Sequence, residues 1–435
     1  MQRIDRRGIE RIGRRSTQSN LSPLGVHINT DRSPLSCLCA HRHVTTSYSP
    51  SVVAALTARG NAKRPSRPWN RHEKVGVLKS RVMLGAMKYL QDVIRAYSRL
   101  SSDPINSEVR PMSGGLINDT FALGNDWVLQ RLHPIFGAEV NLDIAELTVH
   151  LRADGVEVPE ILRTNQNRPW VQIDAPREQG GGVWRVMSRL AGRTLHRLQD
   201  PAQAQSAAML VAHFHRALAN IEHRFHFSRA GAHDTVAHLD SLQSALSELS
   251  EHRLFAEVQP LAREIESLWR AHGELPDLPK RIGHGDLKVS NLLFDSNGDA
   301  KAVLDLDTMA WLTLDVELGD ALRSWCNTCP EDALQAQFSI EIFEAALQGY
   351  GRGASDWLSA PEKRCVVPGL IRICLELSAR FAADALRESY FGWSEQVAPT
   401  RGEHNLLRAR NQLDLARQVI DQRASLETIR LNALG

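Results

Sequence analysis

The stretch RIGHGDLKVSNLLFD, from Arg281 to Asp295, carries the strongest pattern in this 435-residue chain. It places a histidine, an aspartate and an asparagine at fixed offsets, as His284, Asp286 and Asn291, in the pattern H-x-D-x-x-x-x-N. Such residues also occur in ordinary turns between strands, where polar side chains bond to nearby backbone groups. The alternative is the loop of an enzyme that moves a phosphoryl group, which needs an aspartate and an asparagine at this spacing.

Phosphoryl transfer demands little covalent chemistry of the protein, which must orient a hydroxyl group, hold metal ions and neutralise phosphate charge. In this loop Asp286 can accept the hydroxyl proton, and Asn291 can turn its amide oxygen to a Mg²⁺ ion. Mg²⁺ prefers oxygen ligands and takes one or two carboxylates beside phosphate oxygens. The apolar run AVLDLD, at 302–307, offers Asp305 for this role, and Asp307 shares its face if the run is a strand. The combined pattern favours phosphoryl transfer over a plain turn.

A double glycine further upstream is the candidate partner of this loop. MSGGLINDTF places Gly114 and Gly115 between two strand-like segments. Glycines at such a position let backbone N–H groups approach phosphate oxygens. A double glycine is by itself more typical of a plain hairpin turn, but its place before a strand hairpin and a helix favours a phosphate-binding loop.

Residues 86–190 are predicted to form a small α+β lobe with an antiparallel sheet. Apolar residues alternate between helical spacing and strand-like runs in this part of the chain, and the turn signal GND separates two of the runs. The expected elements are a helix at 87–100, strands at 116–123 and 127–132, a helix at 137–155, and strands at 156–164 and 184–192.

Residues 191–435 are predicted to form a larger, mainly helical lobe that carries the loop at 284–291 and the acceptor site. Helical spacing covers 200–221, which opens on Asp-Pro, and 235–272, and it returns from Val316 to the end. Short strands are expected around the loop itself. A sheet-rich lobe followed by a helical lobe is a two-lobed plan with a cleft expected between the lobes.

Residues 1–85 differ sharply in charge from the rest of the chain. They carry 16 Lys/Arg and four Asp/Glu, a net charge of +12, whereas the remaining 350 residues carry 36 and 46, a net charge of −10. This composition predicts a solvated, disordered extension. Three interpretations stay open: an arm for nucleic acid or membrane, a transit peptide, or an upstream extension of the gene model with true initiation at Met83 or Met87.

No run of about 18 apolar residues appears, so we expect no transmembrane helix and a cytoplasmic location. The six cysteines do not make a disulfide framework in a chain of this length. A small hydroxylated acceptor is the expected partner, and neither a membrane nor nucleic acid is expected to bind the main body of the chain. The oligomeric state stays open.

The words HGDLKVSNLLFD and AVLDLDT resemble the aminoglycoside phosphotransferase and choline-kinase-like family, over about residues 86–420. The resemblance implies a two-lobed protein-kinase-like fold, ATP and Mg²⁺ as cofactors, and transfer of the γ-phosphate to a hydroxyl group of a small molecule. It makes Asp286 the base, and Asn291 and Asp305 the metal ligands. His284, Lys288 and Asp307 are then supporting residues.

Two further segments extend the resemblance. WRVMSRLAGRTL is similar to the inter-lobe hinge of the family, in which backbone groups from Met187 to Leu190 would meet the adenine. VELGDALRSWCN is similar to the segment after the metal aspartate, in which Asp320 would support the catalytic loop. The strand lysine of many kinases is missing from WVLQRL, so Gln130 or Arg131 would replace it.

Arg131 is the candidate for reaching a phosphate group, and Glu139 or Glu146 would then be the acid that orients it. Within the family, GGLINDTF, VLQRLHPIF, LDLDTMAW and HNLLRARNQL resemble the N-acetylhexosamine 1-kinase group. That likeness implies a sugar or amino sugar as acceptor. It also implies that Arg380, Asp384 and Arg408 shape the acceptor side of the cleft, where arginine forks suit hydroxyl-rich or anionic compounds.

Leu116 departs from the hexosamine pattern, which has a histidine before Ile-Asn-Asp-Thr. An aminoglycoside or amino-alcohol kinase of the same fold therefore stays an alternative. A non-catalytic nucleotide-binding protein is a third hypothesis, which the presence of Asp286, Asn291 and Asp305 disfavours. The fourth is nucleic-acid binding through the basic extension.

Overall fold

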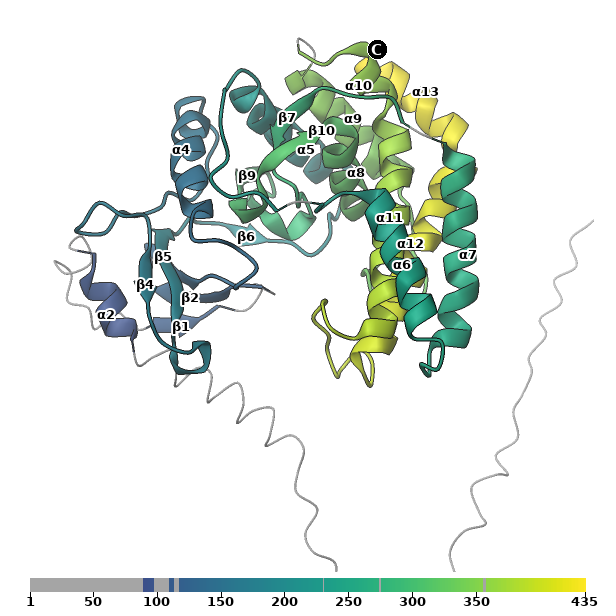
Figure 1. Ribbon diagram of the computed structural model, residues 1–435. Helices are drawn as coiled ribbons and strands as arrows, with labels where there is room; N and C mark the ends of the chain where they lie inside the picture. Colours follow the sequence, from purple (N-terminus) through teal and green to yellow (C-terminus); the bar gives the residue numbers. More distant parts are fainter. Residues whose placement is uncertain (1–88, 98–108, 113–116, 230, 274, 355–356) are drawn as a thin grey trace, which may run out of the picture. The chain divides into compact units, whose positions relative to one another are not determined.

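The computed structural model describes residues 89–97, 109–112, 117–229, 231–273, 275–354 and 357–435 (Figure 1). The basic extension, the double glycine Gly114–Gly115 and Leu116 lie outside these residues, so the predictions made for them stay predictions. No described helix is both long enough and apolar enough to cross a membrane. The four described cysteines are free thiols.

The first part of the described chain is built on a five-stranded antiparallel sheet with the order β1-β2-β3-β5-β4 (Figure 1). The β2–β3 hairpin turns through Gly124, whose φ of 62° favours glycine. The strands are β1 Val109–Pro111, β2 Asp119–Leu123, β3 Trp127–Arg131, β4 Val171–Ile173 and β5 Gly182–Ser188, and the helices are α2 Leu90–Arg95 and α4 Val140–Ala153.

Side-chain alternation gives this sheet two different faces. On one face Leu129 and Val186 are register partners and pack with Trp184 against the apolar side of α2. On the other face Gln130 and Arg185 are register partners and line a cavity. The second face is therefore the one that can present groups to a ligand.

The strand expected at 156–164 was not found. This segment makes only two isolated bridges, Glu157 to Ala302 and Ile161 to Met187. Pro159 lies between them and has no N–H group for a ladder. The strand that pairs with β5 at this edge of the sheet is β4, which was not among the expected strands.

The second part of the chain is mainly helical. Its helices are α5 Pro201–Leu218, α6 Thr235–Glu248, α7 Phe255–His272, α8 Leu314–Trp325, α9 Ile340–Ala354, α10 Ala360–Arg364, α11 Val366–Arg387, α12 Arg401–Asp421 and α13 Arg423–Leu434. Asp200 caps α5 by accepting a hydrogen bond from the Gln203 N–H, which confirms the helix start predicted from Asp-Pro. The long α11 is buried along most of its length and packs against α6, α7, α8 and α12.

The helical stretch expected at 235–272 consists of two helices, α6 and α7. The segment between them is held by tertiary contacts that helical spacing could not reveal. His252 and Arg253 both contact Glu388, just after the end of α11. These contacts outweigh the local preference for one continuous helix.

Close contact between α8 and α11 depends on two glycines. A Cβ atom at Gly319 would lie 2.6 Å from the backbone oxygen of Gly369, and one at Gly369 would lie 2.2 Å from that of Asp315. Either methyl group would force the helices apart. This contact fixes the position of α8 against α11.

Candidate active site

The loop 284–291 connects two short strands. β7 (Lys280–Gly283) precedes it and pairs with β10 (Ala310–Thr313), and β8 (Leu292–Phe294) follows it and pairs with β9 (Ala300–Val303). The loop itself ends in a 3₁₀ turn, η2 (Val289–Asn291). Both ends of the loop are therefore fixed by strand pairing.

Helix α8 holds the backbone of the loop at several points. The buried Glu317 carboxylate accepts hydrogen bonds from the N–H groups of His284 and Gly285. At the other end of the helix Ser324 Oγ accepts from the Val289 N–H, and Trp325 Nε1 donates to the carbonyl of Leu287. Burial acts to raise the pKa of Glu317, but the hydrogen bond and charge of His215 and the backbone hydrogen bond of His284 lower it. The loop thus rests on an ionised carboxylate.

His284 is a positioning residue rather than a proton donor to the substrate. Its ring is fully buried, and Nδ1 accepts from the Asp286 N–H at 3.2 Å, while Nε2 donates to the carbonyl of Leu304 at 2.7 Å. This pattern assigns the neutral Nε2–H form. The adjacent Gly285 has a φ of 78°, and a Cβ atom there would lie 2.5 Å from the Thr308 backbone oxygen. Only glycine fits this turn without strain.

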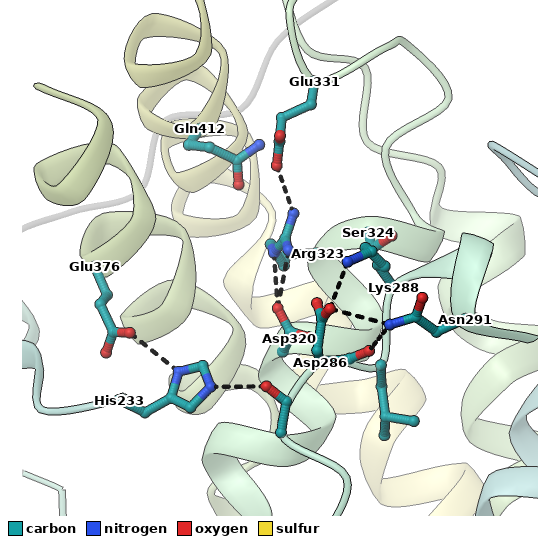
Figure 2. A network of polar contacts seen from close by, with 12 residues as sticks. His233, Asp286, Lys288, Asn291, Asp320, Arg323, Ser324, Glu331, Glu376 and Gln412 are labelled. Atoms are coloured by element: carbon teal, nitrogen blue, oxygen red, sulfur yellow. Dashed lines mark hydrogen bonds and ion pairs between the residues drawn. The ribbon is translucent and has the colours of Figure 1, made fainter. Parts of the chain in front are cut away.

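Asp286 is partly exposed, and its carboxylate has two hydrogen-bond donors beside it. Lys288 Nζ and Asn291 Nδ2 both donate to Asp286 Oδ2, the second at 3.0 Å (Figure 2). Burial acts to raise the pKa of Asp286, but the charge and hydrogen bond of Lys288 outweigh it and lower the pKa. The pKa of Lys288 is raised, because Asp286, Asp305 and Asp320 outweigh its burial. Asp286 is therefore a carboxylate with Oδ1 available to a ligand.

Asp305 and Asp307 do not share a strand face, so that expectation was wrong. β9 ends at Val303, Asp305 adopts a left-handed conformation with φ 59°, and Asp307 lies within the 3₁₀ helix η3 (Leu306–Thr308). Both residues line the cavity, but Asp305 is exposed there whereas Asp307 is buried. The turn separates the two carboxylates into different environments.

Asp307 binds the sheet of the first part of the chain. Its Oδ1 and Oδ2 accept from Arg185 Nη1 at 2.5 Å and Nη2 at 3.0 Å, and Oδ2 also accepts from Asn118 Nδ2 at 2.7 Å. The remaining Arg185 donors go to Gln130 and Asn141. All five N–H donors of this buried guanidinium are thereby used. Arg185 ties β5 to the loop that carries Asp305.

The residues predicted to hold a metal ion fit a hard divalent cation. The Asn291 amide nitrogen is occupied by Asp286, which leaves the amide oxygen for a metal. Burial, Asp307 and Asp286 raise the pKa of Asp305, so a bound cation would relieve the repulsion among these carboxylates. No cluster of three or more His, Cys, Asp or Glu side chains suited to a metal occurs in the described part of the chain. One carboxylate and one amide are nevertheless enough for Mg²⁺ that also binds phosphate oxygens.

These groups meet in one large cavity. It has a volume of about 2110 Å³, and Asp286, Lys288, Asn291 and Asp305 all line it. Pockets for one small molecule usually measure roughly 300–1,000 Å³. The cavity is therefore large enough for two substrates at once.

Comparison with known proteins gives this site its context. Residues 108–358, more than half of the chain, match the family model described as the phosphotransferase enzyme family. The chain belongs to this family. It is a phosphotransferase that acts on a hydroxyl group of a small molecule.

Solved structures show the same fold. An aminoglycoside phosphotransferase from Alicyclobacillus acidocaldarius is 13% identical, with 79% of this chain and 96% of that chain covered and a TM-score of 0.50. An amicoumacin kinase in complex with AMP-PNP and Ca²⁺ is 13% identical, with 80% and 96% covered and a TM-score of 0.51. The predicted two-lobed protein-kinase-like fold, with a sheet-bearing first part and a helical second part, is confirmed.

The predicted nucleotide-binding residues of the phosphotransferase lie in two places. Met187, in β5, and Leu190, just after it, both line the cavity. Arg131 does not, because it lies on the face of the sheet that packs with Trp184 and is bonded to Asp119 and the Arg177 carbonyl. The structure therefore does not support Arg131 as the replacement for the strand lysine.

Neither candidate acid orients Arg131. Glu146 contacts His223 and His226 instead, and Glu139 lies at the start of α4. The buried cation on the cavity side of the sheet is Arg185, which the sequence analysis did not select. Its position opposite Gln130 in the register was the signal that could have found it.

Asp320, Arg380 and Arg408 all line the cavity of the phosphotransferase. Arg323 lies between Asp320 and Glu331 and bonds to both, at 3.0 and 2.9 Å (Figure 2). Asp320 itself makes no hydrogen bond to the catalytic loop. The support predicted for it is given instead by Glu317, Ser324 and Trp325, which share its helix.

Asp384 is buried and does not line the cavity itself. Its oxygens accept from the N–H groups of Ser389, Tyr390 and Phe391 at 2.8–2.9 Å, and from Asn405 Nδ2 at 2.8 Å. It thus holds the turn after α11. Through this turn it positions two aromatic side chains of the cavity wall.

His233 supports the catalytic loop from a second side (Figure 2). Its Nδ1 lies 3.1 Å from Oε1 of the buried Glu376, and its Nε2 lies 3.2 Å from the Gly285 carbonyl. Burial acts to lower the pKa of His233, but Glu376 outweighs it and raises the pKa above 6.5. A protonated His233 ring can donate both of these hydrogen bonds. Its positive charge then lies next to Gly285, the residue that precedes Asp286.

This arrangement predicts a pH-dependent stability. A raised pKa in the folded state means that the contribution of His233 is complete below about pH 6.5 and is lost as the pH rises through the raised value. When the pH rises from about 6 to 9, the free energy of unfolding should therefore decrease less for the His233→Gln variant than for the wild type. Urea unfolding at several pH values measures this difference. His150→Gln, on an exposed position of α4, is the control, and equal pH slopes for wild type and His233→Gln would contradict the assignment.

Proposed function

We propose that this phosphotransferase uses ATP and Mg²⁺ to phosphorylate a hydroxyl group of a sugar or amino sugar. The observation that carries the proposal is the environment of Asp286. Its carboxylate is kept ionised at the wall of a two-substrate cavity, with Lys288, Asn291 and Asp305 beside it. This is the arrangement that in-line transfer to a hydroxyl group requires.

In the proposed reaction the acceptor oxygen forms a bond to the γ-phosphorus while the bond from that phosphorus to the β-bridging oxygen breaks. Asp286 Oδ1 orients the hydroxyl group and takes its proton. Asn291 and Asp305 would hold Mg²⁺, which supplies neutralising charge at the phosphates. Lys288 donates a hydrogen bond to Asp286 Oδ2 and adds a positive charge next to this carboxylate. ADP and the phosphorylated acceptor are the products.

Several features support a nucleotide and a hydroxyl-rich acceptor. The amicoumacin kinase of the same fold was solved with AMP-PNP and Ca²⁺. The Asp320 Oδ2 atom is buried at the cavity wall without a hydrogen-bond partner, and a sugar hydroxyl would supply a donor. The resemblance of GGLINDTF and HNLLRARNQL to the N-acetylhexosamine 1-kinase group supports an acceptor of the sugar type. We further propose that residues 86–190 bind the nucleotide and that 191–435 bind the acceptor.

A screen of acceptors tests the proposal. Free sugars, amino sugars, aminoglycosides and amino alcohols are supplied with ATP and Mg²⁺, and ADP release is measured. We expect turnover with sugars or amino sugars, and its loss when EDTA removes the metal. Turnover confined to aminoglycosides or amino alcohols would contradict the sugar assignment. ADP release that does not depend on any acceptor would contradict the proposed reaction.

A further inference from the structure

Two arginines at the acceptor side of the cavity lie on aromatic rings. The Cζ atom of Arg380 is 5.7 Å from the centre of the Phe391 ring, and that of Arg408 is 5.6 Å from the Phe381 ring. The two rings contact each other, with centres 4.4 Å apart. All four side chains line the cavity. The two guanidinium groups therefore flank one aromatic pair and face the same space.

Arg380 has no hydrogen-bonded counterion among the described residues. Its nearest carboxylate oxygen is Glu376 Oε1, at 3.8 Å, and no hydrogen bond joins them. That oxygen is bonded to His233, and Oε2 of Glu376 accepts from Thr235. The charge of Glu376 is thus committed elsewhere, and the Arg380 guanidinium keeps its donors free.

Arg408 is also incompletely paired. Its Nη1 donates to the Gly392 carbonyl and to Asn405 Oδ1, but its Nε–H is buried without a hydrogen-bond partner. The nearest carboxylate oxygen, Glu331 Oε2, is 4.0 Å from Nε. The other oxygen of Glu331 accepts from Arg323. Arg408 therefore makes no hydrogen bond to a carboxylate of the described residues, and its closest approach to one is the 4.0 Å separation from Glu331.

Hydrogen bonds hold the surface that carries these arginines. Asp384 holds the turn with Tyr390 and Phe391, as described above, and Asn405 bonds to both Asp384 and Arg408. A third arginine, Arg229, lies over Tyr390 and also makes no ion pair in the described structure. Preorganised donors lose little conformational entropy when a ligand binds.

Polar contacts connect this surface to the catalytic loop. Glu376, the neighbour of Arg380, binds His233, and His233 reaches the carbonyl of Gly285 (Figure 2). The next residue is Asp286. A ligand bound at Arg380 and Arg408 therefore lies in the same cavity as the proposed base, Asp286. Glu376, His233 and Gly285 form a chain of polar contacts between the two sites.

We propose that the acceptor carries a carboxylate group, which Arg380 and Arg408 bind while its reacting hydroxyl group lies at Asp286. This inference rests on the proposed function and names the class of acceptor: a sugar acid. Guanidinium groups match carboxylates with paired N–H donors. A carboxylate would accept hydrogen bonds from the free donors of two partly buried guanidinium groups that have no hydrogen-bonded counterion in the described part of the chain. A polycationic acceptor, such as an aminoglycoside, would be repelled here.

Matched pairs of acceptors test this proposal directly. The rate of ADP release is measured with glucose and glucuronate, and with galactose and galacturonate, using the full chain with ATP and Mg²⁺. We expect kcat/KM to be about 10- to 100-fold higher for the acid of at least one pair, which is the range for a charge-assisted hydrogen bond.

Two variants assign the effect to the arginines. Arg380→Met and Arg408→Met keep a long apolar side chain against the aromatic pair but remove the charge. Each should abolish the preference for the acid, measured as the ratio of kcat/KM for the acid to kcat/KM for the matching neutral sugar. The controls are Arg387→Met, at the end of the same helix as Arg380, and Arg410→Met, an exposed residue beside Arg408. Both controls should keep the preference.

The outcomes separate this inference from the proposed function. Equal or faster turnover of the neutral sugars would overturn the carboxylate assignment and leave the proposed function standing. A preference for the acids that survives in both arginine variants would overturn the binding site. If no sugar or sugar acid is turned over above the background of Asp286→Asn, the proposed function fails, and this inference fails with it.

Discussion

The Asp286→Asn variant is expected to lose about 10²- to 10⁴-fold in kcat, which is the usual contribution of a general base. Asparagine has nearly the same shape as aspartate but cannot take a proton from the acceptor. It also removes the charge that Lys288 neutralises in the wild type. Because the loop backbone is held by Glu317, Ser324 and Trp325, the substitution should leave the loop in place.

The measurement is ADP release at saturating ATP and acceptor, with circular dichroism and thermal unfolding to verify the fold. Asp299→Asn is the matched control, because this exposed residue lies in the β8–β9 hairpin that follows the loop and is away from the cavity. It should keep wild-type activity. If Asp286→Asn retains more than about a tenth of the wild-type rate, Asp286 is not the base.

The Arg185→Met variant is expected to lose about 3–5 kcal/mol in free energy of unfolding. Both members of the Arg185–Asp307 pair are buried, with 1% and 3% of their surfaces exposed. Without the guanidinium, Asp307 keeps only the hydrogen bond from Asn118 and becomes a buried charge without a counterion. The loop that carries Asp305 should also shift, so kcat should fall even under conditions in which the variant is folded.

A double-mutant cycle isolates this ion pair from the packing of the side chain. Adding Asp307→Asn to Arg185→Met removes the uncompensated charge and should recover part of the lost stability. Urea unfolding of the four proteins gives the coupling energy. If the two substitutions have additive effects on the free energy of unfolding, the Arg185–Asp307 pair does not couple the sheet to the turn that carries Asp305.

The sequence alone was sufficient for the outline of the site. Asp286, Asn291 and Asp305 line one cavity, as expected for residues that one short loop and the next turn carry. The face of β3 was harder to predict. Its apolar residues Trp127, Val128 and Leu129 occupy both faces of the strand, so alternation did not show that Arg131 points away from the cavity.

Long-range contacts were beyond prediction from the sequence. Arg185 and Asp307 are 122 positions apart, and His233 and Gly285 are 52 apart, so nothing in local spacing joins them. The left-handed turn at Asp305 was also missed, since the apolar run before it reads as a continuing strand. Tertiary contacts to Arg185 and Asn118 stabilise that turn, and they exist only in the folded chain.

Because all five N–H donors of Arg185 are used within the protein, this side chain has none left for the phosphates of a nucleotide. A lysine in a kinase sheet has donors to spare for the phosphates, whereas this guanidinium has none unless it releases Asp307. Arg185 and Asp307 thus join β5 to the turn that carries Asp305, so a nucleotide that displaced β5 would strain this link. We therefore expect nucleotide affinity and metal affinity to be coupled, so that a change in one affinity is accompanied by a change in the other.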